Sequence, residues 1–328
     1  MDFSKLPKVE LHLHLDCSLS YEVVKKINPA ITYDEYRESF IAPPKCYDLV
    51  DYLQRAIKGF ELMQTKEQLR IVTLDLFEQL KADNVIYAEM RFAPLLHIQQ
   101  GLTANEVVAT IDETLSEGIR ESGIEAGLIL CTLRNFNEDQ SMETVKLAHQ
   151  FRGTNVVGFD IAGDEAGFPV ANHVASFQYA QSKGICCTAH AGEAKGPESV
   201  WETVRHFHPQ RLGHGVRSSE DNALLEFLKK ENIHLEVCPT SNIQTNVYER
   251  IEDHTADKIY HSGVSMSINT DCRTISDTTL TNQYGIMEKI FNWKEEHFLK
   301  CNLEAIEHSF CSKEKKEILT EKLISGFA

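Results

Sequence analysis

Two histidines one residue apart, His12 and His14, lie in the first apolar run of the chain, Val9–Leu15. Side chains two residues apart in a β-strand point to the same face, so both imidazoles would lie together while the leucines between them pack on the other face. Two neighbouring neutral imidazoles are half of a common zinc site. The pair alone does not distinguish a metal site from an ordinary strand with one polar face, so further ligands must come from elsewhere in the chain.

The elements that would position such ligands follow a regular pattern. Eight apolar runs are typical of buried strands: Val9–Leu15, Val85–Ala93, Glu125–Leu133, Val156–Ile161, Ile185–His190, Arg211–Gly215, His234–Cys238 and Val264–Asn269. Amphipathic helical segments separate most of them, among them Lys66–Lys81, Ala104–Ser122, Glu198–His206 and Ser219–Asn232. Strands that alternate with helices form parallel sheets, and this number of units predicts a closed (β/α)8 TIM barrel, with an open doubly wound sheet as the alternative.

Two segments depart from this alternation. A long helical insertion, Ser18–Asn84, follows the first strand and contains a helical pattern at Tyr47–Met63. Insertions after a barrel strand lie on the catalytic face, so this helix either forms the wall of a pocket or packs as an ordinary surface helix. The segment Leu280–Ala328 is expected to add C-terminal helices, and the whole chain, residues 1–328, is expected to form a single domain.

Ionisable residues recur where the apolar runs end, which in a TIM barrel is the catalytic face. The strings, in chain order, are HLHLD, DIAGDE, TAHAGE, RLGHG, EVCPTSN and SINTD. The predicted metal ligands are His12, His14, His190 and Asp271. Three imidazoles and one carboxylate suit zinc and leave room for a water molecule. Glu193 could deliver a proton to a substrate, and His214 could orient or deprotonate the water.

In this order and spacing, the strings resemble adenosine deaminases of the metal-dependent amidohydrolase superfamily, from about Val9 to Tyr284. The resemblance implies hydrolytic deamination of adenosine or 2′-deoxyadenosine to inosine or 2′-deoxyinosine and ammonia, with one zinc ion per chain. It also implies catalytic roles for three residues. Glu193 would protonate purine N1 while water attacks C6, His214 would position the water, and Asp271 would bind zinc and orient the water.

The same resemblance implies which residues contact the substrate. Asp16 would accept a hydrogen bond from the ribose 5′-hydroxyl, the Gly163 backbone N–H would meet purine N3, and His14 would lie beside the substrate. Cys272 would stand next to purine N7, where better-known members of the family have a second aspartate. Cys17 is a further departure, because the family usually has glycine there.

A thiol is a weak hydrogen-bond donor, so the N7 contact is expected to be weaker or to be made by another group. The two cysteines are either tolerated substitutions or a sign of altered substrate preference. The alternative substrates are adenine, a modified adenosine or aminodeoxyfutalosine. Asp16 favours a substrate that carries ribose, since free adenine would leave this carboxylate without its partner.

Composition limits the partners and the location of the protein. The net charge is −16, from 33 basic and 49 acidic residues, which argues against nucleic acid or an anionic membrane as a partner. A small purine nucleoside is the expected partner, and the oligomeric state does not follow from the sequence. No secretory signal or membrane span is apparent, and the nine scattered cysteines suit a reducing compartment, so a cytoplasmic location is expected.

Other classes of protein fit the sequence less well. A binuclear amidohydrolase would carry a lysine at the end of the fourth strand, and residues 156–163 contain none. The other class of zinc deaminases combines H-x-E with P-C-x-x-C, and this chain contains no P-C-x-x-C string. A non-catalytic purine-binding protein would be expected to lack Glu193 or a metal-binding histidine, and all of these are present.

Overall fold

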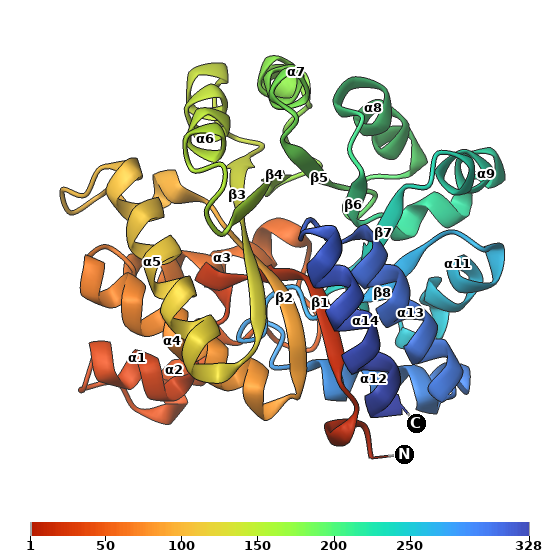
Figure 1. The fold of residues 1–328 in the computed structure, drawn as a ribbon, viewed down its shortest axis with the longest axis horizontal. Coiled ribbons are helices and arrows are strands. Elements are labelled where there is room, and N and C mark those ends of the chain that lie inside the picture. The colour runs from red at the N-terminus through yellow and green to blue at the C-terminus, as the bar shows by residue number, and fades with distance from the viewer. Residues whose placement is uncertain (1, 328) are drawn as a thin grey trace.

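A parallel sheet of eight strands lies at the centre of the computed structural model, which describes residues 2–327 (Figure 1). The strands are β1 (Lys8–His14), β2 (Val85–Phe92), β3 (Glu125–Leu133), β4 (Val156–Ala162), β5 (Cys186–Ala191), β6 (Arg211–His214), β7 (His234–Val237) and β8 (Met266–Ile268). Each strand pairs in parallel with the next one along the chain. The predicted (β/α)8 barrel is therefore confirmed, and each of the eight predicted strands overlaps an observed one.

The sheet closes into a barrel through Asp271, which follows β8. Its backbone N–H donates to the carbonyl of His12 at 3.0 Å, and its own carbonyl accepts from the N–H of His14 at 2.8 Å. The segment that closes the barrel therefore carries one of the predicted metal ligands and lies beside two others.

Helices surround the strands (Figure 1). Those of the insertion are α1 (Tyr21–Ile27), α2 (Tyr33–Phe40), α3 (Leu49–Glu61) and α4 (Lys66–Ala82). The middle of the chain contributes α5 (Ala104–Ser122), α6 (Glu138–Gln150), α7 (Val174–Lys183), α8 (Pro197–Phe207) and α9 (Asn222–Lys230). The last are α10 (Pro239–Gln244), α11 (Ala256–Ser262), α12 (Leu280–Phe291), α13 (Glu295–His308) and α14 (Lys313–Phe327). The expected C-terminal helices are thus present. No helix in residues 2–327 has the length and apolar character needed to cross a membrane.

One predicted helix has different bounds. The segment predicted as a single helix from Ser219 to Asn232 is a 3-10 turn, Val216–Glu220, followed by α9. The side chain of Asp221 accepts hydrogen bonds from the backbone N–H groups of Ala223 and Leu224. This cap satisfies the first free donors of the helix, so α9 begins after Asp221 and not before it.

Close packing of α5 against α4 depends on the absence of a side chain at Gly118. An added Cβ atom there would lie 2.2 Å from two ring atoms of the buried Phe77. We expect Gly118→Ala to lower the free energy of unfolding by about 1–3 kcal/mol, because the core must overpack. The matched control is Gly285→Ala on α12, where no heavy atom lies within 4 Å of the added Cβ apart from the adjacent residues and the nearby backbone of the helix itself. Alanine there is expected to be neutral or to stabilise the helix by up to about 1 kcal/mol. Urea unfolding measures both, and equal midpoints for the two variants would contradict this account of the packing.

Candidate active site

A cavity with a volume of about 400 Å³ lies at the carboxyl ends of the strands. Nearly all of the predicted site residues line it: His14, Asp16, Gly163, His190, Glu193, His214, Asp271 and Cys272. His12 is fully buried behind them. Leu49, Leu53 and Ile57 of α3 line the same cavity, so the insertion helix forms a pocket wall, one of its two predicted roles.

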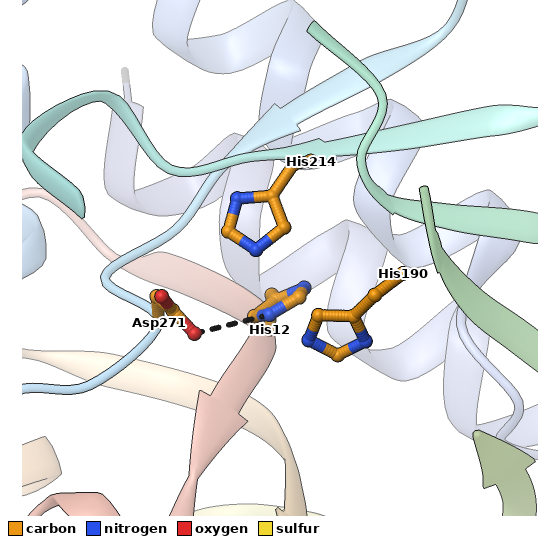
Figure 2. Close-up of side chains that lie close together, drawn as sticks. All are labelled: His12, His190, His214 and Asp271. Atoms are coloured by element: carbon orange, nitrogen blue, oxygen red, sulfur yellow. Dashed lines mark ion pairs between the residues drawn. The ribbon is translucent and has the colours of Figure 1, made fainter. Parts of the chain in front are cut away.

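Four of the predicted residues converge on one point of the cavity (Figure 2). His12, His190, His214 and Asp271 each offer a ligand atom, and these atoms lie within 4.8 Å of one another. His14 is close to the same group, because its Nε2 lies 3.2 Å from Nε2 of His190 and 3.4 Å from Oδ1 of Asp271. The structure thus brings the predicted ligand set together and adds His214 to it.

The chemistry of these donors fits a metal ion. Nδ1 of His12 lies 2.8 Å from Oε2 of Glu236, and Nδ1 of His190 lies 3.1 Å from Oδ2 of Asp160. A carboxylate only accepts hydrogen bonds, so each imidazole carries its proton on Nδ1 and keeps a free lone pair on Nε2. The buried Nε2 of His12 lies 3.2 Å from Oδ1 of Asp271 but makes no hydrogen bond of regular geometry within residues 2–327, as expected of two atoms that bind the same metal ion.

Gly213 on β6 allows the two imidazoles to pack this closely. A Cβ atom added to it would lie 2.8 Å from Cε1 of His12 and 3.0 Å from Cγ of His190. The glycine of the RLGHG string therefore leaves space for the rings of two candidate ligands.

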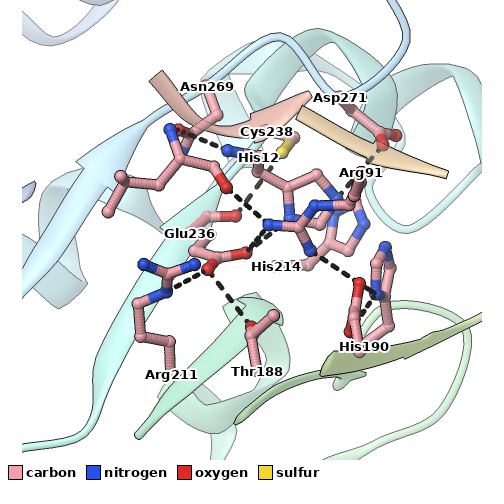
Figure 3. Close-up of polar contacts among 12 residues, drawn as sticks. His12, Arg91, Thr188, His190, Arg211, His214, Glu236, Cys238, Asn269 and Asp271 are labelled. Carbon is pink, nitrogen blue, oxygen red and sulfur yellow. Dashed lines mark hydrogen bonds and ion pairs between the residues drawn. The ribbon is translucent and has the colours of Figure 1, made fainter. Parts of the chain in front are cut away.

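A buried network of charged groups orients these histidines through contacts to their Nδ1 atoms (Figure 3). The guanidinium of Arg91 lies 2.8 Å from Oδ2 of Asp160 and 2.7 Å from Oε2 of Glu236. Arg211 lies 2.6 Å from the other oxygen of Glu236. One guanidinium thus binds both carboxylates that hold His12 and His190.

The network keeps its carboxylates ionised. Burial alone would raise the pKa of Glu236, but Arg91 and Arg211 outweigh it and hold this pKa well below its usual range. The pKa of Asp160 is also lowered, because His190 and Arg91 outweigh the effect of burial. The sequence alone indicates no specific role for these groups. The available indication was a charged residue within a run predicted to be a buried strand, as in Val85–Ala93 and His234–Cys238.

Glu193 presents a carboxyl group with a raised pKa to the cavity. Burial is the main cause of the rise, and the charges of Asp271 and Glu165 add to it. One oxygen lies 3.6 Å from Nε2 of His214, and the other has no hydrogen-bond partner within residues 2–327. This environment favours the protonated form of the carboxyl group, which can transfer its proton to a bound molecule.

Glu165, a residue to which the sequence analysis gave no role, fixes the loop that carries this acid. Its carboxylate accepts hydrogen bonds from the backbone N–H groups of Gly192 at 2.7 Å, Glu193 at 3.0 Å and Lys195 at 2.9 Å. Three backbone amides therefore anchor the loop after β5, and this gives the carboxyl group of Glu193 a defined position.

Asp16 has a partner that the sequence did not indicate. Its Oδ2 lies 3.6 Å from Nε2 of His97, and it accepts a hydrogen bond from the backbone N–H of Ala93 at 3.4 Å. Burial acts to raise the pKa of Asp16, but the interaction with His97 outweighs it and lowers this pKa. Asp16 is thus an ionised acceptor on the cavity wall.

Cys17 and Cys272, the two departures from the family pattern, are neighbours in the structure. Both are buried, both line the cavity, and both belong to one cluster of buried apolar side chains. The nearby Cys272 thiol acts to lower the pKa of Cys17, but burial and the charges of Asp16 and Asp271 together outweigh it and raise this pKa to about 11. Burial also raises the pKa of Cys272. The pair therefore presents neutral thiols to the cavity.

A TIM barrel with clustered imidazoles, a carboxylate and a buried acid at its catalytic end defines the class of metal-dependent barrel hydrolases. Comparison with known proteins identifies the family. The adenosine deaminase family profile matches residues 7–325. An adenosine deaminase of Clostridium botulinum (strain Kyoto / Type A2) is 37% identical over 327 residues, covering 97% of each chain. One from Clostridium acetobutylicum is 35% identical over 325 residues, again with 97% of each chain covered.

The chain therefore belongs to the adenosine deaminase family, and it is a hydrolytic deaminase. Solved structures share its fold. An adenine deaminase from Arthrobacter aurescens has a TM-score of 0.90 at 23% identity, with 98% of each chain covered. An N6-methyl-AMP deaminase from Arabidopsis thaliana has a TM-score of 0.85 at 24% identity, with 98% of this chain and 97% of that one covered.

The orienting role of Asp160 can be tested by measuring metal affinity. We expect Asp160→Asn to weaken zinc binding by about 10–100-fold, because the neutral amide no longer fixes the proton of His190 on Nδ1. Competition with a chelator measures the dissociation constant, and circular dichroism checks the fold. Asp139→Asn, at an exposed position of α6, is the matched control and should bind zinc as the wild type does. Equal zinc affinity in Asp160→Asn and the wild type would show that Asp160 does not orient a ligand.

Proposed function

We propose that this protein is a zinc-dependent deaminase of adenosine and 2′-deoxyadenosine, which releases inosine or 2′-deoxyinosine and ammonia. One observation carries the proposal: the buried carboxyl group of Glu193 lines the same cavity as three imidazoles and a carboxylate, those of His14, His190, His214 and Asp271. An acid that holds its proton and a metal centre are the two components that hydrolysis of an aromatic amidine needs. Membership of the family supports the same chemistry.

In this proposal, His12, His14, His190 and Asp271 bind one zinc ion. A bound zinc ion lowers the pKa of a coordinated water to about 7 and so provides a nucleophile near neutral pH. This ligand set has the mixture of imidazole and carboxylate that zinc accepts. Asp271 is held in place on its other side, because its Oδ2 accepts a hydrogen bond from the hydroxyl of Ser241 at 2.7 Å.

The chain's own residues then move the protons. Glu193 donates a proton to purine N1, which withdraws electrons from C6 and prepares it for attack. His214 and Asp271 orient the attacking water toward C6. The two protons of the water balance the reaction: one passes to the amino group, which leaves as ammonia when its bond to C6 breaks and the C6 oxygen becomes a keto group, and the other restores the carboxyl group of Glu193. Gly163 and Cys272 contact the purine, His14 lies beside it, and Asp16 accepts a hydrogen bond from the ribose 5′-hydroxyl.

The charge of the cavity favours a nucleoside over a nucleotide. No lysine or arginine belongs to the cavity lining within residues 2–327, whereas Asp16 and Asp164 both do. A 5′-phosphate would carry a charge of about −1.5 to −2 and would lie near the ionised Asp16 without a cation. We therefore expect the substrate to be uncharged at the 5′ position, unlike that of the N6-methyl-AMP deaminase of similar fold.

The alternatives are a related adenine compound or adenine itself. The neighbouring thiols of Cys17 and Cys272 favour a modified adenosine or aminodeoxyfutalosine, because they change the surface beside the purine. Adenine is disfavoured, since it would leave Asp16 without its ribose partner. The single domain over residues 1–328 and the cytoplasmic location stay predictions.

Ammonia release from a panel of substrates tests the proposal. The panel contains adenosine, 2′-deoxyadenosine, adenine, methylthioadenosine, aminodeoxyfutalosine, AMP and N6-methyl-AMP, with zinc content measured on the same sample. We expect turnover of the two nucleosides and at least about 10²-fold lower kcat/KM for AMP, because a buried unpaired charge costs several kcal/mol. The control is Glu193→Gln, which should bind zinc but lose about 10²–10⁴-fold in kcat. Turnover of AMP in preference to adenosine, or no turnover by zinc-loaded protein, would refute the proposal.

The contribution of Cys272 can be tested by introducing the aspartate that better-known members of the family have at this position. We expect Cys272→Asp to change the ratio of kcat/KM for adenosine over aminodeoxyfutalosine by about tenfold, since a protonated carboxyl group donates a stronger hydrogen bond to N7 than a thiol does. Cys301→Ser, at a buried position of α13 outside the cavity lining, is a control for loss of a buried thiol. An unchanged ratio across the panel would show that Cys272 is merely a tolerated substitution.

A further inference from the structure

We infer that Asn242 and His254 are positioning residues that hold His214 with its ring proton on Nε2. In this tautomer, His214 donates a hydrogen bond into the cavity and cannot coordinate the metal through Nε2. The inference rests on the proposed function and deepens it, because it chooses between the two roles that the sequence left open for His214. It also separates His214 from the true ligands in a cluster of four similar donors.

Three consecutive hydrogen bonds connect His214 to a backbone amide. The N–H of Ala256 donates to Nδ1 of His254 at 3.1 Å. Nε2 of His254 lies 3.2 Å from Oδ1 of Asn242, and Nδ2 of Asn242 lies 3.0 Å from Nδ1 of His214. His254, Asn242 and His214 are all buried, so water does not replace these partners.

The direction of each of these hydrogen bonds follows from the backbone N–H of Ala256, the last group in the series. A backbone N–H can only donate, so Nδ1 of His254 must be an acceptor and its ring proton must be on Nε2. That proton is donated to the carbonyl oxygen of the Asn242 side chain. The NH₂ group of Asn242 therefore faces His214 and donates to its Nδ1. With Nδ1 as an acceptor, the proton of the neutral His214 ring is on Nε2.

The opposite orientation of the Asn242 side-chain amide is excluded by the same count of hydrogen-bond donors and acceptors. If its NH₂ group faced His254, both nitrogens of that imidazole would have to accept, and a neutral imidazole has only one acceptor. Protonation of His254 fails too, because it would place an N–H against the N–H of Ala256. Burial lowers the pKa of His254 to about 3, which keeps the ring neutral near pH 7.

The result is two opposite tautomers in one cluster. Carboxylates hold the protons of His12 and His190 on Nδ1, so the Nε2 lone pairs of these rings are free for a metal. An amide donor holds the proton of His214 on Nε2, which lies 3.6 Å from the carboxyl oxygen of Glu193. His214 is therefore a fixed donor beside the acid, able to stabilise negative charge on the attacking oxygen.

The tautomer can be measured directly in the zinc-loaded protein. Two-bond ¹H–¹⁵N correlations of ¹⁵N-histidine-labelled protein distinguish a protonated ring nitrogen from one with a lone pair. The His214 signals are assigned by their absence in His214→Asn. We expect the proton of wild-type His214 on Nε2 and that of wild-type His254 on Nε2. A wild-type His214 with its proton on Nδ1 would overturn the inference, whatever any variant does.

The variant Asn242→Asp provides a second test of the inference. An aspartate accepts from both neighbours, so the proton of His214 should move to Nδ1. We expect kcat for adenosine to fall by at least about tenfold and KM to change by less than about threefold, since the wrong tautomer of a catalytic histidine lowers kcat by up to about 10⁴ in a serine protease. The matched control is Asn246→Asp, the same substitution at an exposed position beyond α10, which should leave the His214 tautomer unchanged.

The tautomer measurement and the Asn242→Asp variant distinguish failure of this inference from failure of the proposed function. The wild-type tautomer is read without turnover, so a protein that fails to deaminate adenosine but shows the Nε2 proton overturns the proposed function and supports the inference. Deamination of adenosine with the proton on Nδ1 overturns the inference alone. An Asn242→Asp variant that folds and keeps both the wild-type tautomer and the wild-type kcat also overturns it.

Discussion

The site depends on one buried guanidinium. Arg91 binds Asp160 and Glu236 at 2.8 and 2.7 Å, and these carboxylates hold His190 and His12. Charges buried this completely are costly unless each is paired and hydrogen-bonded, and removing one partner typically costs about 3–5 kcal/mol. The network therefore locks two candidate ligands from opposite sides of the barrel into one geometry. It also places their free lone pairs in the cavity before a metal arrives, which is how a preorganised site is built.

The residue that closes the barrel also belongs to the candidate metal site. Asp271 closes the seam between the first and last strands with its backbone, while its side chain joins the cluster. Both Asp271 and His214 have left-handed backbone conformations, with φ of +67° and +59°. Such conformations are costly for residues other than glycine and tend to persist where the surroundings impose them. In this protein, they occur at two side chains that face the same point of the cavity.

Patterns that are local in sequence predicted the fold and the cluster. Apolar runs located all eight strands, and the shared catalytic face of a barrel brought His12, His190 and Asp271 together from distant positions. What could not be predicted depends on register between strands. The pairing of Arg91 with Glu236 joins β2 to β7 across the barrel interior, and no local pattern records which inward-facing residues share a layer. The hydrogen bonds from Ala256 to His214 depend on a loop conformation. The start of α9 differs from the prediction because the side chain of Asp221 caps the helix.

The central claim is that this cavity adds water to C6 of a bound purine nucleoside with help from a metal and the acid Glu193. Purine riboside, which is adenosine without its amino group, can accept water at C6 but has no group to release. Isothermal titration calorimetry should show that zinc-loaded protein binds it at least about 10²-fold more tightly than metal-free protein, because transition-state analogues gain from interactions that the ground state lacks. Equal affinity with and without zinc, or no binding at all, would contradict the account.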